Sequence, residues 1–288
     1  MTNKWLKVAL MVTAIATGTS IKIDAETVLY VPQDDRPVSL QYTVDTAREA
    51  GMTVLTPPQH LISGKTYQGQ ADQIMAWVEQ NAGRADVMVL STDTLIYGGL
   101  VDSRKHNIPL STLQNRLKRI EGLKARNKNV RIYGFGTVMR SPRASGGGTE
   151  PAYYAEYGPT IFQIAALQDK LDSGSLTQEE TQKLMSLQAS VPVEYLQDWF
   201  DHRQKNMKIN KELIDETRSG VFDYFALGHD DTSQLSQSAL EGRYLNKYSK
   251  DISVEKYGSF PGADQLGLLL MARSRTDEST EKPTFSVI

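Results

Sequence analysis

Two adjacent carboxylates stand at the end of an apolar stretch of the sequence, a position where side chains can enter a binding site. The apolar stretch 222–227 is followed by Gly228, His229 and then Asp230 and Asp231. Carboxylates this close repel each other when both are ionised, which raises the pKa of one and can leave an acid beside a base. We therefore predict that Asp230 and Asp231 are catalytic residues.

Further acidic and basic side chains follow other apolar stretches, in motifs that suit the binding of hydroxyl or charged groups. Guanidinium groups form paired hydrogen bonds with anionic groups, and carboxylates accept hydrogen bonds from hydroxyls. Each motif also has a structural interpretation, because Asp is common in turns, and Asp264 can cap the apolar helix that follows it. The residues predicted to bind substrate are Asp34, Asp35, Arg36, Asp93, Tyr97, Arg104, Arg140 and Asp264.

The order of apolar stretches indicates alternating strands and helices that would position these motifs. Short apolar runs bounded by Pro or Gly predict strands, and apolar residues three or four positions apart predict helices. Strands are predicted at 27–31, 52–55, 86–90, 130–135, 222–227, 252–254 and 284–288. Helices are predicted at 40–50, 71–82, 110–125, 235–248 and 263–273, with a nearly all-helical stretch at 151–220.

Repeated alternation of strands and helices predicts an α/β fold with a parallel sheet. Seven such units approach the eight of a closed barrel, and polar motifs follow at least five of the strands. Because a barrel builds its site from the loops at the carboxyl ends of its strands, we favour a (β/α)-barrel-like fold, incomplete at the C-terminus. The alternative is a doubly wound parallel sheet with a helical insertion, whose ligand would bind where the strand order reverses.

The composition excludes several classes of protein. With 40% hydrophobic and 23% charged residues, the chain is typical of a globular protein rather than a disordered or fibrous one. Its formal charge of −2 lacks the basic excess of nucleic-acid-binding proteins, so no nucleic-acid partner is expected. The absence of cysteine excludes disulfides, thiolate catalysis and Cys-ligated metals.

The N-terminus has the three parts of a secretory signal peptide. Lys4 and Lys7 supply the positive charge, 8–16 is an uncharged apolar run, and Ala25 is the predicted last residue before cleavage. The run is far shorter than the roughly 20 residues that span a bilayer. We therefore expect an exported protein, periplasmic or extracellular, with no membrane span after the signal peptide is cleaved.

The predicted domain organisation follows from these elements. Residues 1–25 form the signal peptide, and 26–288 form a single α/β domain with a helical insertion at about 151–220. The chain stops inside a predicted strand with no helix behind it, so we expect the domain to continue beyond residue 288.

At these motifs the sequence resembles a bacterial family known only as domain of unknown function 4127. The resemblance is carried by VPQDDRPV, DTLIYGGLVDSR, GTVMRSP, EPAYYAEYG, HDDT and PGADQLGLLLMAR, which span most of the mature chain. The resemblance implies no settled activity. It implies longer chains that continue past residue 288, and an uncharged polar residue at the position of His229, which argues against His229 as an essential catalyst.

We expect an exported carbohydrate-active enzyme with a glycan or small-molecule substrate, in the first instance a glycoside hydrolase. Asp230 and Asp231 would be its two carboxyl groups. Adjacent carboxylates also suit hydrolysis assisted by the substrate's own acetamido group. This hypothesis requires no cofactor.

Two alternatives use the same loops. The first is a metal-dependent hydrolase, because an oxygen-rich site suits a divalent cation such as Mg²⁺, Mn²⁺ or Ca²⁺. The second is a non-catalytic glycan-binding protein of the cell envelope. The residues of the metal site in the first alternative would be Asp34, Asp35, Asp93, His229 and Asp230.

Overall fold

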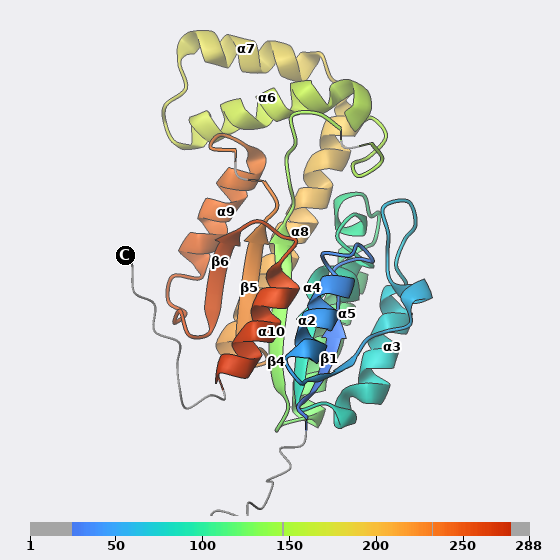
Figure 1. Cartoon of the computed structure of the whole chain (residues 1–288). Helices are drawn as coiled ribbons and strands as arrows, with labels where there is room; N and C mark the ends of the chain where they lie inside the picture. Colours follow the sequence, from blue (N-terminus) through green and yellow to red (C-terminus); the bar gives the residue numbers. More distant parts are fainter. Residues whose placement is uncertain (1–24, 146, 232, 278–288) are drawn as a thin grey trace, which may run out of the picture.

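A computed structural model describes residues 25–145, 147–231 and 233–277, which form a parallel β-sheet with helices on both faces (Figure 1). All neighbouring strands are parallel, in the order β2-β1-β3-β4-β5-β6. This confirms the α/β class, and the order is typical of the doubly wound alternative, with a reversal between β1 and β3. The strands are β1 (Thr27–Val31), β2 (Thr53–Leu55), β3 (Val87–Ser91), β4 (Arg131–Val138), β5 (Tyr224–His229) and β6 (Tyr257–Pro261).

The sheet is buried on both faces, because successive side chains of each strand point in opposite directions. In β1, Val28 and Tyr30 pack with α2 (Gln41–Glu49) and α10 (Leu266–Asp277). Leu29 and Val31 belong to the core of the opposite face. That face is covered by helices α3 (Ala71–Asn81), α5 (Leu110–Arg126), α8 (Val193–Ser219) and α9 (Gln237–Tyr248).

The stretch between β4 and β5 consists mainly of helices α6 (Tyr154–Asp172), α7 (Gln178–Ala189) and α8. Figure 1 shows α6 and α7 beyond one end of the sheet, away from its helical layers. They have a core of their own, in which the Tyr154 ring lies 4.7 Å from the Trp199 ring of α8. This stretch therefore has an apolar core besides the two that flank the sheet.

Several short elements differ from the predicted ones or were not predicted. The strand predicted at 252–254 is wrong: Ile252 packs on the core from a turn, and the edge strand β6 follows it. The segment after β3 begins with α4 (Thr92–Tyr97), which Ser91 caps through its hydroxyl and Gly98 ends with a positive φ of 112°. The described residues also include three short 3₁₀ helices, which are η1 (Gln59–Leu61), η2 (Ala82–Arg84) and η3 (Asp102–Arg104).

The predicted signal peptide, up to residue 24, and the predicted strand at 284–288 lie outside the described residues. Within the described ranges, no helix is long and apolar enough to cross a membrane.

Candidate functional site

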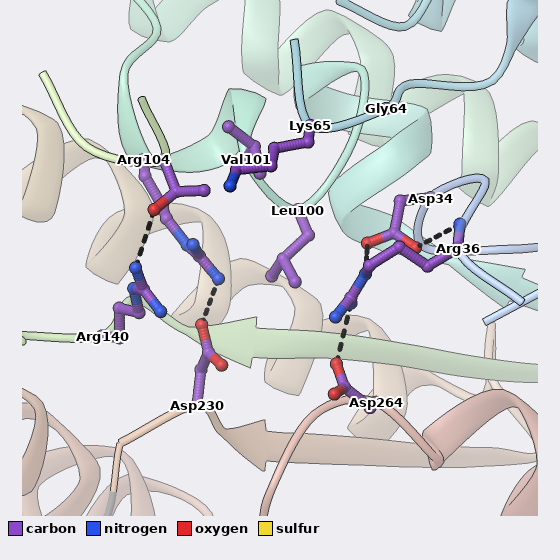
Figure 2. A pocket seen from close by; sticks show the side chains of 11 residues that line it. Asp34, Arg36, Gly64, Lys65, Leu100, Val101, Arg104, Arg140, Asp230 and Asp264 are labelled. Carbon is purple, nitrogen blue, oxygen red and sulfur yellow. Dashed lines mark hydrogen bonds and ion pairs between the residues drawn. The ribbon is translucent and has the colours of Figure 1, made fainter. Parts of the chain in front are cut away.

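The loops that follow the strands meet around one cavity of about 320 Å³ at the carboxyl edge of the sheet (Figure 2). Every strand from β1 to β6 is followed by a segment that contributes to its wall. This is the edge at which α/β folds bind their ligands. The lining residues are Asp34, Arg36, Gly64, Lys65, Leu100, Val101, Arg104, Arg140, Thr149, Asp230 and Asp264.

The cavity brings together most, but not all, of the residues predicted from the sequence. Asp34, Arg36, Arg104, Arg140, Asp230 and Asp264 line it. Asp35, Asp93, Tyr97 and Asp231 do not belong to its lining.

Arg36 joins the loop after β1 to the loop after β6. Its Nε donates a hydrogen bond to Asp34 Oδ2 at 2.8 Å, and its Nη2 donates to Asp264 Oδ1 at 2.7 Å. The backbone N–H of Arg36 also donates to Asp34 Oδ1, at 3.1 Å. Asp34 is buried, whereas the side chain of Asp264 is 49% exposed. One guanidinium therefore orients two carboxylates at this end of the cavity.

Arg104 and Asp230 form a second ion pair, in which Nη2 donates to Asp230 Oδ2. Only 5% of the Arg104 side chain and 16% of the Asp230 side chain are exposed. Burial raises the pKa of the Asp230 carboxyl, and the Arg104 and Arg140 guanidinium groups act in the opposite direction. Burial also disfavours the charged form of Arg104 and so lowers its pKa. The pair therefore places a partly desolvated carboxyl group at the cavity wall.

Arg140, after β4, is held by Glu150, which sequence reasoning missed as a site residue. Arg140 Nε donates to Glu150 Oε1 at 2.7 Å, and Nη2 donates to Thr149 Oγ1 at 2.8 Å. Glu150 is buried, and its Oε1 also lies 4.0 Å from Arg104 Nη1. One sequence feature could have identified Glu150 as a site residue. It is a carboxylate that comes directly before Pro151, at the start of the next helical stretch, and after a run of glycines.

The loop after β4 is anchored from behind by Arg203 of α8, which is also absent from the sequence prediction. Its Nε and Nη2 donate to the two carboxylate oxygens of Glu241, both at 2.7 Å. Nη1 donates to the carbonyl of Arg140 at 2.9 Å, and Nη2 to that of Met139 at 2.6 Å. The backbone at Arg140 is thereby fixed to helices α8 and α9.

Asp231 turns away from the cavity that Asp230 lines. Its Oδ1 accepts from the backbone N–H of Ser233 at 2.9 Å and its Oδ2 from that of Ser141 at 3.3 Å. It lines a neighbouring cavity of about 310 Å³ together with His229, whose Nε2 lies 2.7 Å from Ser259 Oγ. The structure thus separates the two carboxylates that the sequence places side by side.

Asp93 is buried, and its Oδ2 accepts a hydrogen bond from Thr137 Oγ1 at 2.8 Å. Burial raises the pKa of the Asp93 carboxyl to about 7. Asp35 accepts a hydrogen bond from the hydroxyl of Tyr67. Tyr97 is buried, with its ring 4.9 Å from the His106 ring. The Asp93 and Asp35 carboxylates thus have hydrogen-bond partners in the protein itself, whereas the Tyr97 hydroxyl is buried without one among the described residues.

Lys65, in the loop after β2, is a lining residue that no sequence motif singled out. Lys65 is exposed, and Figure 2 shows its side chain extending into the cavity. Within the described ranges it has neither a hydrogen bond nor an ion pair. The signal that could have found it is its place in a loop at the same edge of a parallel sheet as the predicted residues.

The carboxylates of the cavity are engaged by guanidinium groups, as Asp34 is by Arg36 and Asp230 by Arg104. Among the described residues, no group of three or more Asp, Glu, His or Cys side chains is arranged to hold a metal ion. What the arrangement offers a ligand is a set of fixed hydrogen-bond donors and acceptors with one partly desolvated carboxyl group.

Comparison with family models gives one match that covers nearly the whole chain. The model described as "Protein of unknown function (DUF4127)" matches residues 28–288, which include β2 to β6 and every residue that lines the cavity. A comparison with curated proteins gave no match. The chemistry of the site therefore has to be inferred from its own residues.

Proposed function

Because the chain belongs to the DUF4127 family, whose description assigns no activity, we propose a function from the cavity itself. We propose that the protein is an exported carbohydrate-active enzyme, a glycoside hydrolase that takes a saccharide into this cavity. The observation that carries the proposal is that Asp230 and Asp264 line one cavity from the ends of neighbouring strands (Figure 2). Glycosidases use two carboxyl groups that flank the scissile bond.

The two carboxyl groups lie in different surroundings, which suits two different roles. Burial raises the pKa of Asp230, so this group retains a proton at higher pH and can protonate the leaving oxygen. Arg104 occupies only its Oδ2. Asp264 is half exposed and accepts a charge-assisted hydrogen bond from Arg36, as suits a carboxylate that acts as base or nucleophile.

The remaining polar groups would bind the hydroxyl groups of the saccharide. Asp34 and Thr149 are fixed by hydrogen bonds to Arg36 and Arg140, respectively, so they enter the complex with little loss of side-chain freedom. In this proposal Asp231 acts as a positioning residue, because its carboxylate holds the backbone of the loops after β4 and β5.

The test uses the chain from residue 26 and a panel of 4-nitrophenyl glycosides and oligosaccharides. Removing a general acid or a second carboxylate costs about 10²–10⁴-fold in rate. We therefore expect Asp230→Asn and Asp264→Asn to lose activity at least a hundredfold while both variants remain folded by circular dichroism. Asp201→Asn, which removes one exposed carboxylate on α8 outside the cavity, is the matched control and should retain wild-type activity.

Release of no sugar from any substrate of the panel would contradict the proposal, as would full activity in Asp230→Asn. One observation favours a second candidate, a non-catalytic glycan-binding protein: Asp34, Asp230 and Asp264 are each paired with an Arg, which prearranges the cavity for binding. In that case a glycan binds by calorimetry, binding survives Asp230→Asn, and the wild-type chain leaves the glycan intact.

A further inference from the structure

The two ends of the cavity carry opposite charges. At one end, the single guanidinium of Arg36 lies between the carboxylates of Asp34 and Asp264. At the other end, the guanidinium groups of Arg104 and Arg140 pair with the carboxylates of Asp230 and buried Glu150, respectively. Lys65 is a third cation that lines the cavity, and Figure 2 shows its ammonium group on the same side of Leu100 as Arg104.

Figure 2 shows this separation, with Leu100 between the two groups. With all these groups ionised, the Arg36 end has one carboxylate more than cations. The Lys65 end has one cation more than carboxylates while buried Asp93, which interacts with Asp230 and Arg104, holds its proton. A ligand that matches the cavity therefore carries a negative charge at one end and hydrogen-bond donors at the other.

Lys65 supplies the excess cation. While Asp230 is ionised, it balances the charge of Arg104, and Glu150 balances that of Arg140. When Asp230 holds the proton of the general acid, Arg104 adds a further positive charge to this end of the cavity. For Lys65, the described part of the chain provides no ion pair or hydrogen bond. Its ammonium group is therefore available to a ligand.

The backbone of the loop that carries Lys65 is held by hydrogen bonds, which determine where this side chain starts at the cavity wall. The backbone N–H of Gly69 donates to Asp102 Oδ2 at 3.0 Å, and the backbone N–H of Asp35 donates to the carbonyl of Ser63 at 2.9 Å. Within the loop, the N–H of Gly64 donates to the carbonyl of Tyr67 at 3.1 Å. These bonds attach both ends of the loop to the segments after β1 and β3.

We propose that the ligand of this cavity is an acidic saccharide, whose anionic substituent pairs with Lys65 while its hydroxyl groups donate to Asp34 and Asp264. That the ligand is a saccharide rests on the proposed function; that it is anionic rests on the charge distribution. A carboxylate, as in a hexuronic acid, and a sulfate ester share the chemistry that an ammonium group beside guanidinium groups recognises. A neutral sugar leaves the charge of Lys65 without a partner as it displaces water from the cavity.

The experiment measures binding by isothermal titration calorimetry to the chain from residue 26. The three probes are glucuronate, glucose 6-sulfate and glucose. We expect at least one of the two anionic probes to bind roughly tenfold or more tightly than glucose at low salt, since a charge-assisted hydrogen bond contributes a factor of this size. The ratio between the two anionic probes distinguishes a carboxylate from a sulfate. The advantage over glucose should shrink as sodium chloride is added.

Lys65→Gln should lower the affinity for the preferred anionic probe roughly tenfold and leave the affinity for glucose unchanged. The matched control is Lys128→Gln, which removes the same charge from an exposed residue before β4, at the opposite edge of the sheet. It should bind all three probes as the wild type does. The inference is overturned if glucose binds as tightly as both anionic probes, if Lys65→Gln binds them as the wild type does, or if no probe binds.

These outcomes are separate from the test of hydrolysis. The panel of glycosides includes 4-nitrophenyl glucuronides and sulfated glycosides. If an anionic probe binds through Lys65 but none of these glycosides is cleaved, the proposed function fails and the inference stands. If only neutral glycosides are cleaved and Lys65→Gln cleaves them normally, the inference fails and the proposed function stands.

Discussion

At the scale of single residues, the buried pair of Arg203 and Glu241 anchors the backbone at Arg140. Removing one partner of a buried ion pair leaves the other charge without compensation and costs about 3–5 kcal/mol. We expect Arg203→Met to lower the free energy of unfolding by that amount, measured by urea denaturation, because Glu241 would remain buried and unpaired. Arg126→Met, whose side chain is 58% exposed, should cost less than about 1 kcal/mol.

The double variant Arg203→Met/Glu241→Leu separates the loss of charge pairing from the loss of packing. If the unpaired Glu241 causes the damage, the double variant should be more stable than Arg203→Met alone. A double variant less stable than either single variant would contradict this explanation.

The second residue prediction concerns Asp93 and pH. Burial raises its pKa in the folded chain to about 7 from the ordinary 3.8, so the folded state holds this proton more tightly than the unfolded state. The resulting stabilisation is complete below about pH 4 and is lost as pH rises through about 7. A shift of this size corresponds to about 4 kcal/mol.

Asp93→Asn cannot titrate and serves as the reference. The free energy of unfolding of the wild type minus that of Asp93→Asn should fall as pH rises from about 4 to about 7 and then level off. It can be followed by urea denaturation at a series of pH values. A difference that stays constant over this range would show that Asp93 is ionised normally in the folded chain.

Residue types at strand ends predicted much of the cavity but could not predict the direction in which each side chain points. Asp230 and Asp231 are adjacent, yet one lines the cavity and the other binds the backbone of Ser141 and Ser233. That difference depends on partners far away in the sequence. Lys65 was missed for a related reason, since an isolated lysine in a loop has no distinguishing pattern until its neighbours in space are known.

At the scale of elements, the loop 62–70 depends on a close approach between two backbone segments. A Cβ atom at Gly69 would lie 2.0 Å from the carbonyl oxygen of Gly98, which cannot move away as a flexible side chain could. We expect Gly69→Ala to cost about 1–3 kcal/mol, as overpacking typically does, and to displace the loop that carries Lys65.

Thermal unfolding measures the loss of stability in Gly69→Ala, and titration with the preferred anionic probe measures the effect of the displaced loop on binding. Gly83→Ala is the matched control, because no atom lies within 4 Å of its added Cβ and it lies in the short helix η2. It should be as stable as the wild type or slightly more stable. Equal stability and affinity in Gly69→Ala and Gly83→Ala would refute the role of this contact.

Elements with a continuous apolar run were predictable, and those without one were not. The strand predicted at 27–31 matches β1, and β3 is shifted by one residue from the predicted 86–90. β6 was misplaced because its sequence, YGSFP, contains glycine, serine and proline and no continuous apolar run. An edge strand with little burial tolerates such residues. α4 has only six residues, too few to show a helical period.

At the scale of the whole molecule, export is a prediction that rests on residues 1–25. Expression of the full chain in a Gram-negative host, followed by cell fractionation, should place the protein in the periplasm, with a mature chain that begins at Glu26 by mass spectrometry. A version that starts at Glu26 after a single initiating Met should remain in the cytoplasm. Recovery of the full, unprocessed chain in the cytoplasm would contradict the prediction.

The pairing of Arg36 with Asp264 joins residues that are 228 positions apart, and that of Arg104 with Asp230 joins residues 126 apart. Contacts between such distant residues form late, because the intervening chain must first be ordered. A chain that is still being synthesised, or still threading through a translocon, can therefore form the Arg104–Asp230 pair only after residue 230 is released. It can form the Arg36–Asp264 pair only after the segment that follows β6 is released. Ligand recognition by this cavity becomes available only once the segment that follows β6 has emerged, so a chain stalled before that point would not compete for the ligand.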